Sequence, residues 1–285
     1  LNQEVVPSMR LLQFAGKAAR KTNICAYNCS FIAPKSFKDF GEIMYISMCG
    51  TGVGWSVESE NIQALPQIKK QTGKILPTYI IADSKEGWAD AFIFGLKTWF
   101  EGVDVAFDFS LIRPAGSMLK TMGGKSSGPE PIRSLLAFSR EKILKRQGSH
   151  LSNLDAHDII CKIGECVVAG GVRRSAMISL SDLDDEAIRD SKKGQFYNTE
   201  AQRMLANNSA VYNFKPTTSE FLDEWTALVK SGSGERGIFN RGGLAKTLPA
   251  RRLKQFSNGV FPAWGTNPCG EIILQSKQFC NLSEV

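Results

Sequence analysis

The chain has 285 residues, of which 42% are hydrophobic and 22% charged, and its formal net charge is +7. This composition indicates a globular protein of one or two domains and excludes a disordered or low-complexity chain. No segment approaches the roughly 18 apolar residues of a membrane-spanning helix, and basic residues alternate with acidic ones. The sequence therefore predicts neither a membrane nor a nucleic-acid partner.

The ends of the chain and its cysteines indicate where it works. The chain begins with Leu1, its first twenty residues lack a secretory signal, and it stops at Val285 soon after a cysteine-bearing stretch. We interpret it as an internal piece of a longer protein. The chain has seven cysteines, which is an odd number, and it has no export signal. These two features predict a reducing compartment and a cytoplasmic location.

Helical and strand patterns alternate along the sequence. In chain order we predict helices at 7–20 and 36–49, strands at 54–58 and 79–82, a helix at 84–99, a strand at 103–109, helices at 132–145 and from Ser152 onward, a strand at 176–180, a helix at 184–192, a strand at 210–214, a helix at 219–230 and a strand at 237–240. This alternation predicts an α/β fold with a parallel sheet. We interpret 61–102 as a candidate helical insertion.

The sharpest local signal is Gly265-Thr266-Asn267-Pro268-Cys269-Gly270-Glu271. Glycine and proline on both sides of Cys269 predict a tight loop. Alternation along that loop would send the side chains of Asn267, Cys269 and Glu271 to one side. A thiol, a carboxylate and an amide together suit radical or nucleophilic chemistry, although a turn with a buried cysteine has the same pattern.

The remaining cysteines and histidines predict no metal site. Their spacings are C-x3-C at Cys25 and Cys29 and C-x4-C at Cys161 and Cys166, which are not the paired C-x2-C units of zinc sites. We interpret Cys161 and Cys166 as small apolar residues on a buried helix face, and His157 as a structural residue of the same helix.

Two glycine-rich loops are candidates for close contact with a ligand. Residues 49–54 have the glycine spacing of a dinucleotide loop but follow a helix rather than a strand, so the match is weak. Residues 169–175 place two glycines before two arginines, which suits a loop that grips a phosphate or a base, or an ordinary turn.

Taken together, Asn267–Ile272, the Phe279–Leu282 stretch and the Tyr27–Ser30 stretch resemble ribonucleotide reductase. Further stretches resemble the monomeric, adenosylcobalamin-dependent (class II) ribonucleoside-triphosphate reductases in particular: 48–54, 83–89, 113–116, 162–165, 170–175 and 233–241. The resemblance runs from about residue 7 to residue 285 and covers the first part of such an enzyme.

The resemblance implies that 1–285 is the first part of a ten-stranded α/β barrel, with a central finger loop around 265–272. Cys269 would carry the thiyl radical at the tip of this loop, and Asn267 and Glu271 would flank the ribose. Cys29 and Cys280 would be a redox-active dithiol that ends each turnover as a disulfide, reduced by a thioredoxin-like protein. Glu271 would take the 3′-hydroxyl proton, and one thiol, for which we favour Cys29, would protonate the departing 2′-hydroxyl.

The resemblance also implies a set of ligands. Ser8, Asn28 and the Gly50 backbone would position a ribonucleoside triphosphate. A deoxynucleoside triphosphate effector would contact Lys35, Ser36, Phe37, Arg113, Lys120, Gly171, Arg173 and Arg174. The cofactor would be adenosylcobalamin, held mostly by residues outside this chain, and the full-length enzyme would be a monomer.

Two alternatives stay open. The chain could belong to a reductase that takes its radical from a metal-bearing partner protein (class I), although the short interval between Cys269 and Cys280 favours the cobalamin type. It could also be a nucleotide-binding or nucleic-acid-binding α/β module without redox chemistry. We expect the 285-residue chain by itself to be an open half-barrel with an exposed sheet edge and no reductase activity.

Overall fold

The computed structural model describes residues 6–119, 123–169, 177–255 and 264–284. Its centre is a six-stranded sheet in the order β11-β2-β3-β6-β7-β8. The bounds are β2 (Cys29–Ile32), β3 (Gly52–Ser56), β6 (Met177–Asp182), β7 (Ala206–Val211), β8 (Gly237–Phe239) and β11 (Gln278–Cys280). Five of these strands run parallel, and β11 joins β2 antiparallel. The predicted α/β fold with a parallel sheet is confirmed.

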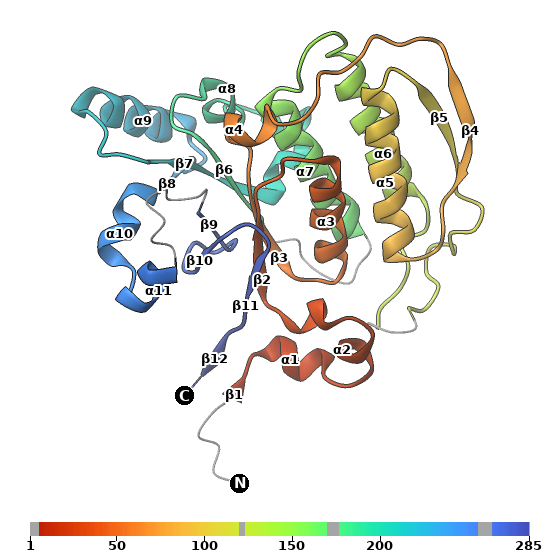
Figure 1. Cartoon of the computed structure of the whole chain (residues 1–285), viewed down its shortest axis with the longest axis horizontal. Coiled ribbons are helices and arrows are strands. Elements are labelled where there is room, and N and C mark those ends of the chain that lie inside the picture. Colours follow the sequence, from red (N-terminus) through yellow and green to blue (C-terminus); the bar gives the residue numbers. More distant parts are fainter. Residues whose placement is uncertain (1–5, 120–122, 170–176, 256–263, 285) are drawn as a thin grey trace.

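Helices cover one face of the sheet, and a mixed layer covers the other (Figure 1). The helical layer holds α3 (Phe37–Met48), α5 (Lys85–Phe100), α6 (Glu130–Leu144) and α7 (Asn153–Ala169), and a small parallel sheet of β4 (Ile75–Ile80) and β5 (Asp104–Asp108) lies outside it. On the other face lie α9 (Thr218–Ser231), α10 (Leu244–Thr247), α11 (Ala250–Gln255) and a short hairpin of β9 (Gly265–Thr266) and β10 (Ile273–Leu274).

Side-chain alternation along β2 shows that both faces are packed. Phe31 belongs to the apolar cluster on the hairpin face, whereas Ile32 belongs to the cluster under the helices, and both are fully buried. Successive side chains of a strand point to opposite faces, so β2 is buried between the two layers. The same alternation turns Cys29 toward the hairpin face, where it packs against the cluster that contains Phe31.

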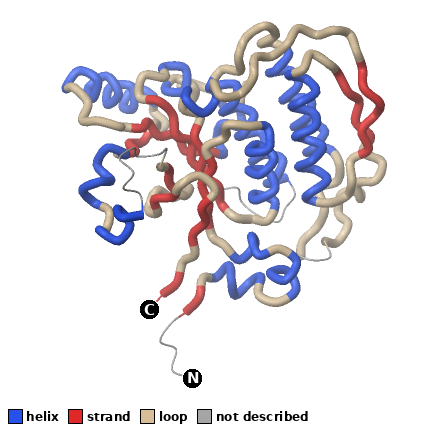
Figure 2. Tube along the Cα trace, in the orientation of Figure 1, coloured by secondary structure: helices blue, strands red, loops and turns tan. Residues whose placement is uncertain are grey.

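The remaining elements are short. They are β1 (Val6–Pro7), α1 (Met9–Phe14), α2 (Lys17–Lys21), α4 (Ser59–Ile62), α8 (Glu186–Arg189), β12 (Ser283–Glu284) and 3-10 turns at Asn23–Ala26, Phe196–Asn198, Ala201–Leu205 and Arg241–Gly243. Strands β1 and β12 pair antiparallel, which brings the two ends of the described chain together beneath the sheet (Figure 2).

The structure corrects several predicted bounds. The helix predicted at 7–20 is broken into α1 and α2, because Gly16 between them takes a φ of 93°, outside the helical range. The helix predicted at 184–192 shrinks to the four residues of α8. Within the candidate insertion 61–102 the structure contains strand β4 as well as helix α5, so that segment is not all helical; its status as an insertion stays a prediction.

Two predicted helix starts are confirmed by hydrogen bonds. The Ser84 hydroxyl accepts from the Gly87 backbone at the start of α5, at 2.9 Å. The Ser152 hydroxyl accepts from the Asp155 backbone at the start of α7, at 3.1 Å. Both satisfy amide groups that have no partner inside the helix.

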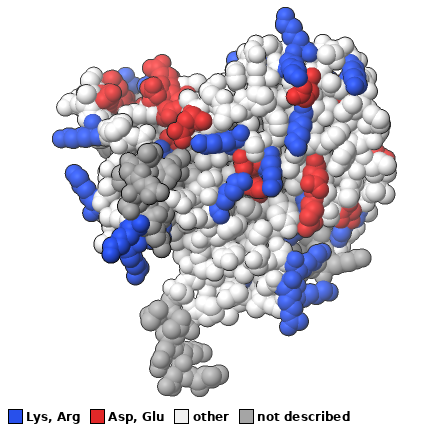
Figure 3. Space-filling model, viewed as in Figure 1, with Lys and Arg blue, Asp and Glu red and all other residues white. Residues whose placement is uncertain are grey.

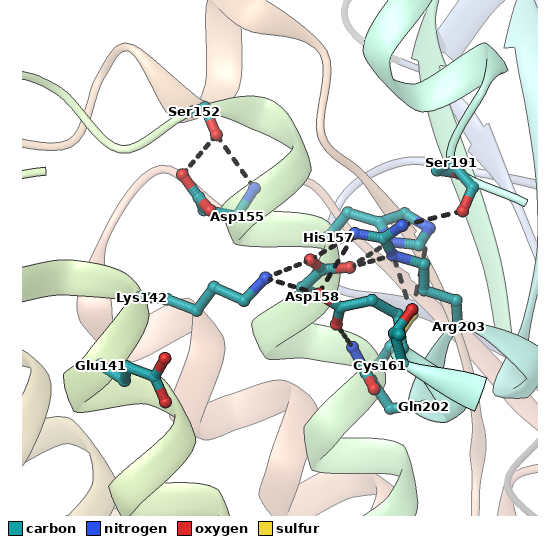
Figure 4. A network of polar contacts seen from close by, with 12 residues as sticks. Glu141, Lys142, Ser152, Asp155, His157, Asp158, Cys161, Ser191, Gln202 and Arg203 are labelled. Atoms are coloured by element: carbon teal, nitrogen blue, oxygen red, sulfur yellow. Dashed lines mark hydrogen bonds and ion pairs between the residues drawn. The ribbon is translucent and has the colours of Figure 1, made fainter. Parts of the chain in front are cut away.

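A buried polar network joins α7 to α6 and to the turn before β7 (Figure 4). The fully buried Asp158 carboxylate accepts from Arg203 at 2.6 and 2.8 Å and from Lys142 at 2.7 Å. Burial alone would raise the pKa of Asp158, but these hydrogen bonds hold it below its usual value. The network is structural and fixes α7 in the helical layer.

His157 and Cys161 belong to this network rather than to the sheet's other face. His157 Nε2 lies 2.9 Å from Asn208 Oδ1 on β7, and Cys161 Sγ lies 3.7 Å from His157 Nδ1. Burial lowers the pKa of His157, yet Cys161, Asp158 and Asn208 raise it to about 10. His157, Cys161 and Cys166 are all buried, as the sequence predicted for structural residues of this helix.

The surface and the helices add two observations. In Figure 3 basic and acidic side chains lie next to one another over much of the visible face. Among the described helices, none is both long enough and apolar enough to cross a bilayer.

Candidate active site

Two cysteines lie side by side where β2 meets β11. Cys29 opens β2, Cys280 closes β11, and the antiparallel register places them directly opposite each other. Side chains in such a pair have Cβ atoms about 5 Å apart, so the two thiols are direct neighbours. All seven cysteines of the chain are free thiols in this structure. The sequence placed these two residues 251 positions apart, and the sheet brings them together.

The two thiols influence each other's ionisation. The hydrogen bond between the Cys29 and Cys280 side chains raises the pKa of Cys29, and burial of Cys29 adds to that rise. The same hydrogen bond lowers the pKa of Cys280, helped by the Cys29 backbone. These opposite directions make Cys280 the more readily ionised thiol of the pair.

The loop that carries Cys269 is the tip of the β9–β10 hairpin, which lies against β2 and β3. A Cβ atom on Gly54 would lie 1.9 Å from the Thr266 carbonyl oxygen, and one on Gly265 would lie 2.0 Å from the Phe31 ring. Only glycine permits these approaches, so the two glycines let the hairpin lie directly on the sheet.

The loop is held by its own asparagine. The Asn267 side chain donates to Glu271 Oε1 at 2.7 Å and accepts from the Ile272 backbone at 3.0 Å. Residues 268–270 form a turn, and Gly270 takes a φ of 86°. A turn, rather than the predicted alternation, therefore relates the three residues: Asn267 is fully buried, while Cys269 and Glu271 are exposed.

This turn still brings the three loop residues to the thiol pair. Asn267 hydrogen-bonds with Cys29, and the Glu271 charge acts on both Cys29 and Cys280. Burial first, then the negative charge of Glu271 and the neighbouring Cys29 thiol, raise the pKa of Cys269. Three sulfurs, one carboxylate and one amide thus share one site at the edge of the sheet.

The predicted substrate-positioning residues lie at the same end of the sheet. The Ser8 hydroxyl accepts from the Leu11 backbone as the cap of α1, and its neighbour Pro7 pairs with Ser283. The Asn28 backbone donates to Cys280 at 3.0 Å, and the Asn28 side chain accepts from Leu282 at 3.3 Å. Gly50, with a φ of 79°, ends α3 just before β3.

The predicted effector residues lie far apart. The Lys35 backbone and the Ser36 hydroxyl both donate to Asp39 at the start of α3, and Phe37 packs edge-on against Phe100 at the end of α5. Arg113 instead donates to Asp83, just before the start of α5, at 2.7 Å. The helix rises 1.5 Å per residue, so the length of α5 separates the contact at Phe100 from the contact at Asp83 by about 25 Å. Lys120, Gly171, Arg173 and Arg174 lie outside the described residues.

The 233–241 segment forms buried ion pairs that the sequence did not predict. Arg236 donates to both Glu224 oxygens at 2.9 Å, and Arg241 donates to both Glu58 oxygens at 2.7 Å. The available signal was three charged residues, Glu235, Arg236 and Arg241, in a segment otherwise rich in glycine and apolar residues. Within the described ranges, no group of three or more His, Cys, Asp or Glu side chains is arranged to hold a metal ion.

Comparison with known proteins finds similar enzymes. The chain is 31% identical over 294 residues to the adenosylcobalamin-dependent ribonucleoside-triphosphate reductase of Lacticaseibacillus paracasei, which covers 88% of the chain and 37% of that relative. It is also 31% identical over 294 residues to the enzyme of the same name from Euglena gracilis, covering 98% of the chain and 38% of the relative.

A solved structure described as a B-12 dependent (class II) ribonucleotide reductase superposes with a TM-score of 0.78 at 25% identity, over 99% of the chain and 46% of that structure. The chain is a relative of the class II ribonucleotide reductases. It spans less than half the length of the curated relatives it matches, 37% and 38% for the two named above. No family model matches it. The class II reductase structure shares its α/β architecture with a mostly parallel sheet.

Proposed function

We propose that this chain is the thiol-bearing part of an adenosylcobalamin-dependent ribonucleoside-triphosphate reductase, which makes deoxyribonucleotides for DNA synthesis. The observation that supports this most is the cross-strand pair of Cys29 and Cys280 beside the hairpin loop of Cys269. A turn with a merely buried cysteine would need neither the exposed thiol nor the dithiol next to it. The likeness to reductases that bear this name supports the same proposal.

The proposed reaction begins at Cys269. A thiyl radical on its sulfur takes the hydrogen from C3′ of the ribose, which weakens the neighbouring C2′–O bond. Glu271 accepts the 3′-hydroxyl proton while one thiol of the pair protonates the 2′-hydroxyl, which leaves as water. The dithiol then supplies two electrons, and a second proton that goes to C2′, and becomes a Cys29–Cys280 disulfide. Glu271 returns its proton to the 3′-oxygen, and Cys269 returns its hydrogen to C3′ and regains the radical. A thioredoxin-like dithiol reduces the disulfide before the next turnover.

The ionisation of the thiol pair supports the role that we favour for Cys29. Because the shared hydrogen bond raises the pKa of Cys29, this thiol still carries a proton when Cys280 ionises. A protonated thiol is what the departing hydroxyl needs, which supports Cys29 as the proton donor.

Adenosylcobalamin would generate the radical. Cys269 is exposed at the loop tip, whereas Cys280 is buried and Cys29 half-buried behind it. This arrangement suits a radical source that approaches from outside the loop. The part of this chain is to receive the radical at the Cys269 sulfur and to hold that sulfur beside the dithiol.

The ligand proposals extend from this site. Ser8, Asn28 and the Gly50 backbone would position the triphosphate substrate from the end of the sheet next to the dithiol. The effector proposal rests on resemblance: Lys35, Ser36 and Phe37 lie at one end of α5 and Arg113 at the other, so two separate contacts would be needed. A turnover-dependent disulfide fits the proposed cytoplasmic, reducing environment.

The test uses the complete coding region that contains this chain. The purified product is given a ribonucleoside triphosphate and a dithiol, with adenosylcobalamin in one arm and a class I radical-generating partner in the other. Deoxynucleotide formed only in the cobalamin arm supports the proposal. Deoxynucleotide formed only with the metal-bearing partner would favour the class I reading, and nucleotide binding without reduction in either arm would favour a non-redox module.

A further inference from the structure

The segment 233–241 is joined to three other parts of the chain by ion pairs. Glu235 pairs with Lys192 at 2.7 Å, Arg236 with Glu224 on α9, and Arg241 with Glu58 beyond the end of β3. The side chains of Arg236, Arg241 and Glu58 are all less than a tenth exposed. Buried charges of this kind are rare unless they are paired and hydrogen-bonded. The function proposed above uses none of them.

Arg241 makes the contact that reaches the candidate site. Its Nη1 and Nη2 atoms donate to the two Glu58 oxygens at 2.7 Å each, and its Nε donates to the Trp264 carbonyl oxygen at 2.8 Å. Nη1 also donates to Asn213 Oδ1 at 3.2 Å. The planar fork of arginine can make these bonds together, whereas the single ammonium of lysine cannot.

Glu58 is itself held in place. The Ser56 hydroxyl donates to Glu58 Oε2 at 2.8 Å, and the Asn61 side chain donates to the same hydroxyl at 2.9 Å. The carboxylate is therefore a fixed anchor on the end of the central strand β3, and it fixes the Arg241 fork in turn.

Trp264 is the residue directly before the hairpin that presents Cys269. Its carbonyl is held by Arg241, and the next two residues, Gly265 and Thr266, lie against Phe31 and Gly54. Those two approaches are steric and prevent the hairpin from moving toward the sheet. The hydrogen bond from Arg241 instead opposes movement of the hairpin away from the sheet.

We propose that Glu58 and Arg241 are positioning residues, which set the place of the hairpin so that the Cys269 thiol stays beside Glu271 and Cys29. The consequence for catalysis rests on the proposed function, but the placement of the thiol does not. A measurement of the thiol can therefore fail independently of a measurement of turnover.

The chain offers a matched control. Glu224 and Arg236 form a second buried pair with two short bonds, at 2.9 Å each, and Arg236 lies five residues before Arg241 on the same segment. Arg236 donates otherwise to Ser181, Asp182 and Leu183, at the end of β6, and not to the hairpin. Glu224→Gln should therefore disturb a comparable ion pair without freeing the Cys269 loop.

The experiment measures the pH profile of Cys269 alkylation by iodoacetamide in the full polypeptide that carries this chain, without cofactor. Peptide mass spectrometry reports each cysteine separately. In the unaltered protein, the pKa of Cys269 is raised by burial, Glu271 and Cys29. In Glu58→Gln and Arg241→Lys the loop moves out of that environment, and the midpoint of the profile falls toward the ordinary value of about 8.5. A fall of half a unit increases the alkylation rate at a pH below the midpoint about threefold.

The proposal is upheld if both hairpin variants shift the Cys269 profile while Glu224→Gln leaves it in place at a similar loss of thermal stability. It is overturned if the folded Glu58→Gln and Arg241→Lys proteins keep the original profile, or if Glu224→Gln shifts it equally. Where Glu58→Gln alone fails to fold, Arg241→Lys decides. If both fail to fold while Glu224→Gln folds, the pair serves the fold as a whole and the positioning role is overturned.

Discussion

The candidate catalytic residues and the candidate effector residues were predicted from the same resemblance, but only the catalytic residues lie close together in the structure. Cys29, Cys280 and the Cys269 loop converge on one sheet edge. Lys35–Phe37 and Arg113 lie at opposite ends of α5. Strand register and a short hairpin determine relative positions to within a residue, whereas segments at the two ends of a long helix are kept apart by its length.

The largest expected effect tests the catalytic residues. Cys269→Ser in the complete enzyme should lower deoxynucleotide formation on the order of 10³-fold or more, because serine cannot carry the sulfur radical. The assay is product formation with adenosylcobalamin and a dithiol. Cys166→Ala, which alters a buried thiol on α7, is the matched control and should retain most of the activity. Equal activity in the two variants would remove the radical role from Cys269.

A second prediction concerns the rigidity of the helical layer. The pKa of His157 is raised to about 10 in the folded chain, against an ordinary value of about 6.5. Because the folded state binds the proton more tightly, the stabilisation is complete below pH 6.5 and is lost as the pH rises toward 10. The loss should be on the order of a few kcal/mol, measured as the free energy of unfolding by urea between pH 6 and 10.

The variant His157→Gln provides the control for this measurement. It removes the titrating group that faces Asp158, Cys161 and Asn208, so most of the pH dependence between 6.5 and 10 should disappear. A slope that persists unchanged would assign the pH dependence to another group.

A third prediction compares two glycines that lie close to neighbouring atoms, Gly54 under the hairpin and Gly41 in α3. Gly54→Ala should destabilise the chain by about 1–3 kcal/mol, because the new Cβ would lie 1.9 Å from the backbone oxygen of Thr266. Gly41→Ala places a Cβ 2.3 Å from the flexible end of Ile93 and gains helix propensity, so its net cost should be smaller. Thermal unfolding of both variants tests the order, and a larger cost for Gly41→Ala would contradict the tight seating of the hairpin.

The smallest effects are expected at the effector candidates. Arg113 and Asp83 form a partly exposed ion pair, with side chains 28% and 31% exposed, so Arg113→Ala should cost about 1 kcal/mol of stability or less. If both regions contact a nucleotide, Arg113→Ala and Lys35→Ala should each weaken effector binding several-fold. Their separation predicts that the two losses add in the double variant, measured by calorimetry. Strong non-additivity would show that the two regions act as one site.

Local patterns determined much of this protein. Hydrophobic periodicity, caps such as Ser84 and the glycine and proline around Cys269 predict the α/β alternation and a tight cysteine loop, because these signals act over one or two turns of chain. The resemblance in the motifs named Cys29, Cys269 and Cys280 as partners before any distance was known.

Only the tertiary structure decided what depends on residues remote in sequence. Three features have no local signature in the sequence. They are the register that sets Cys29 opposite Cys280, the salt bridge from Glu58 to Arg241, and the separation of Arg113 from Phe37. Each arises because a sheet and its helices place particular backbone segments at fixed distances, and burial then makes any unpaired charge or misplaced side chain costly.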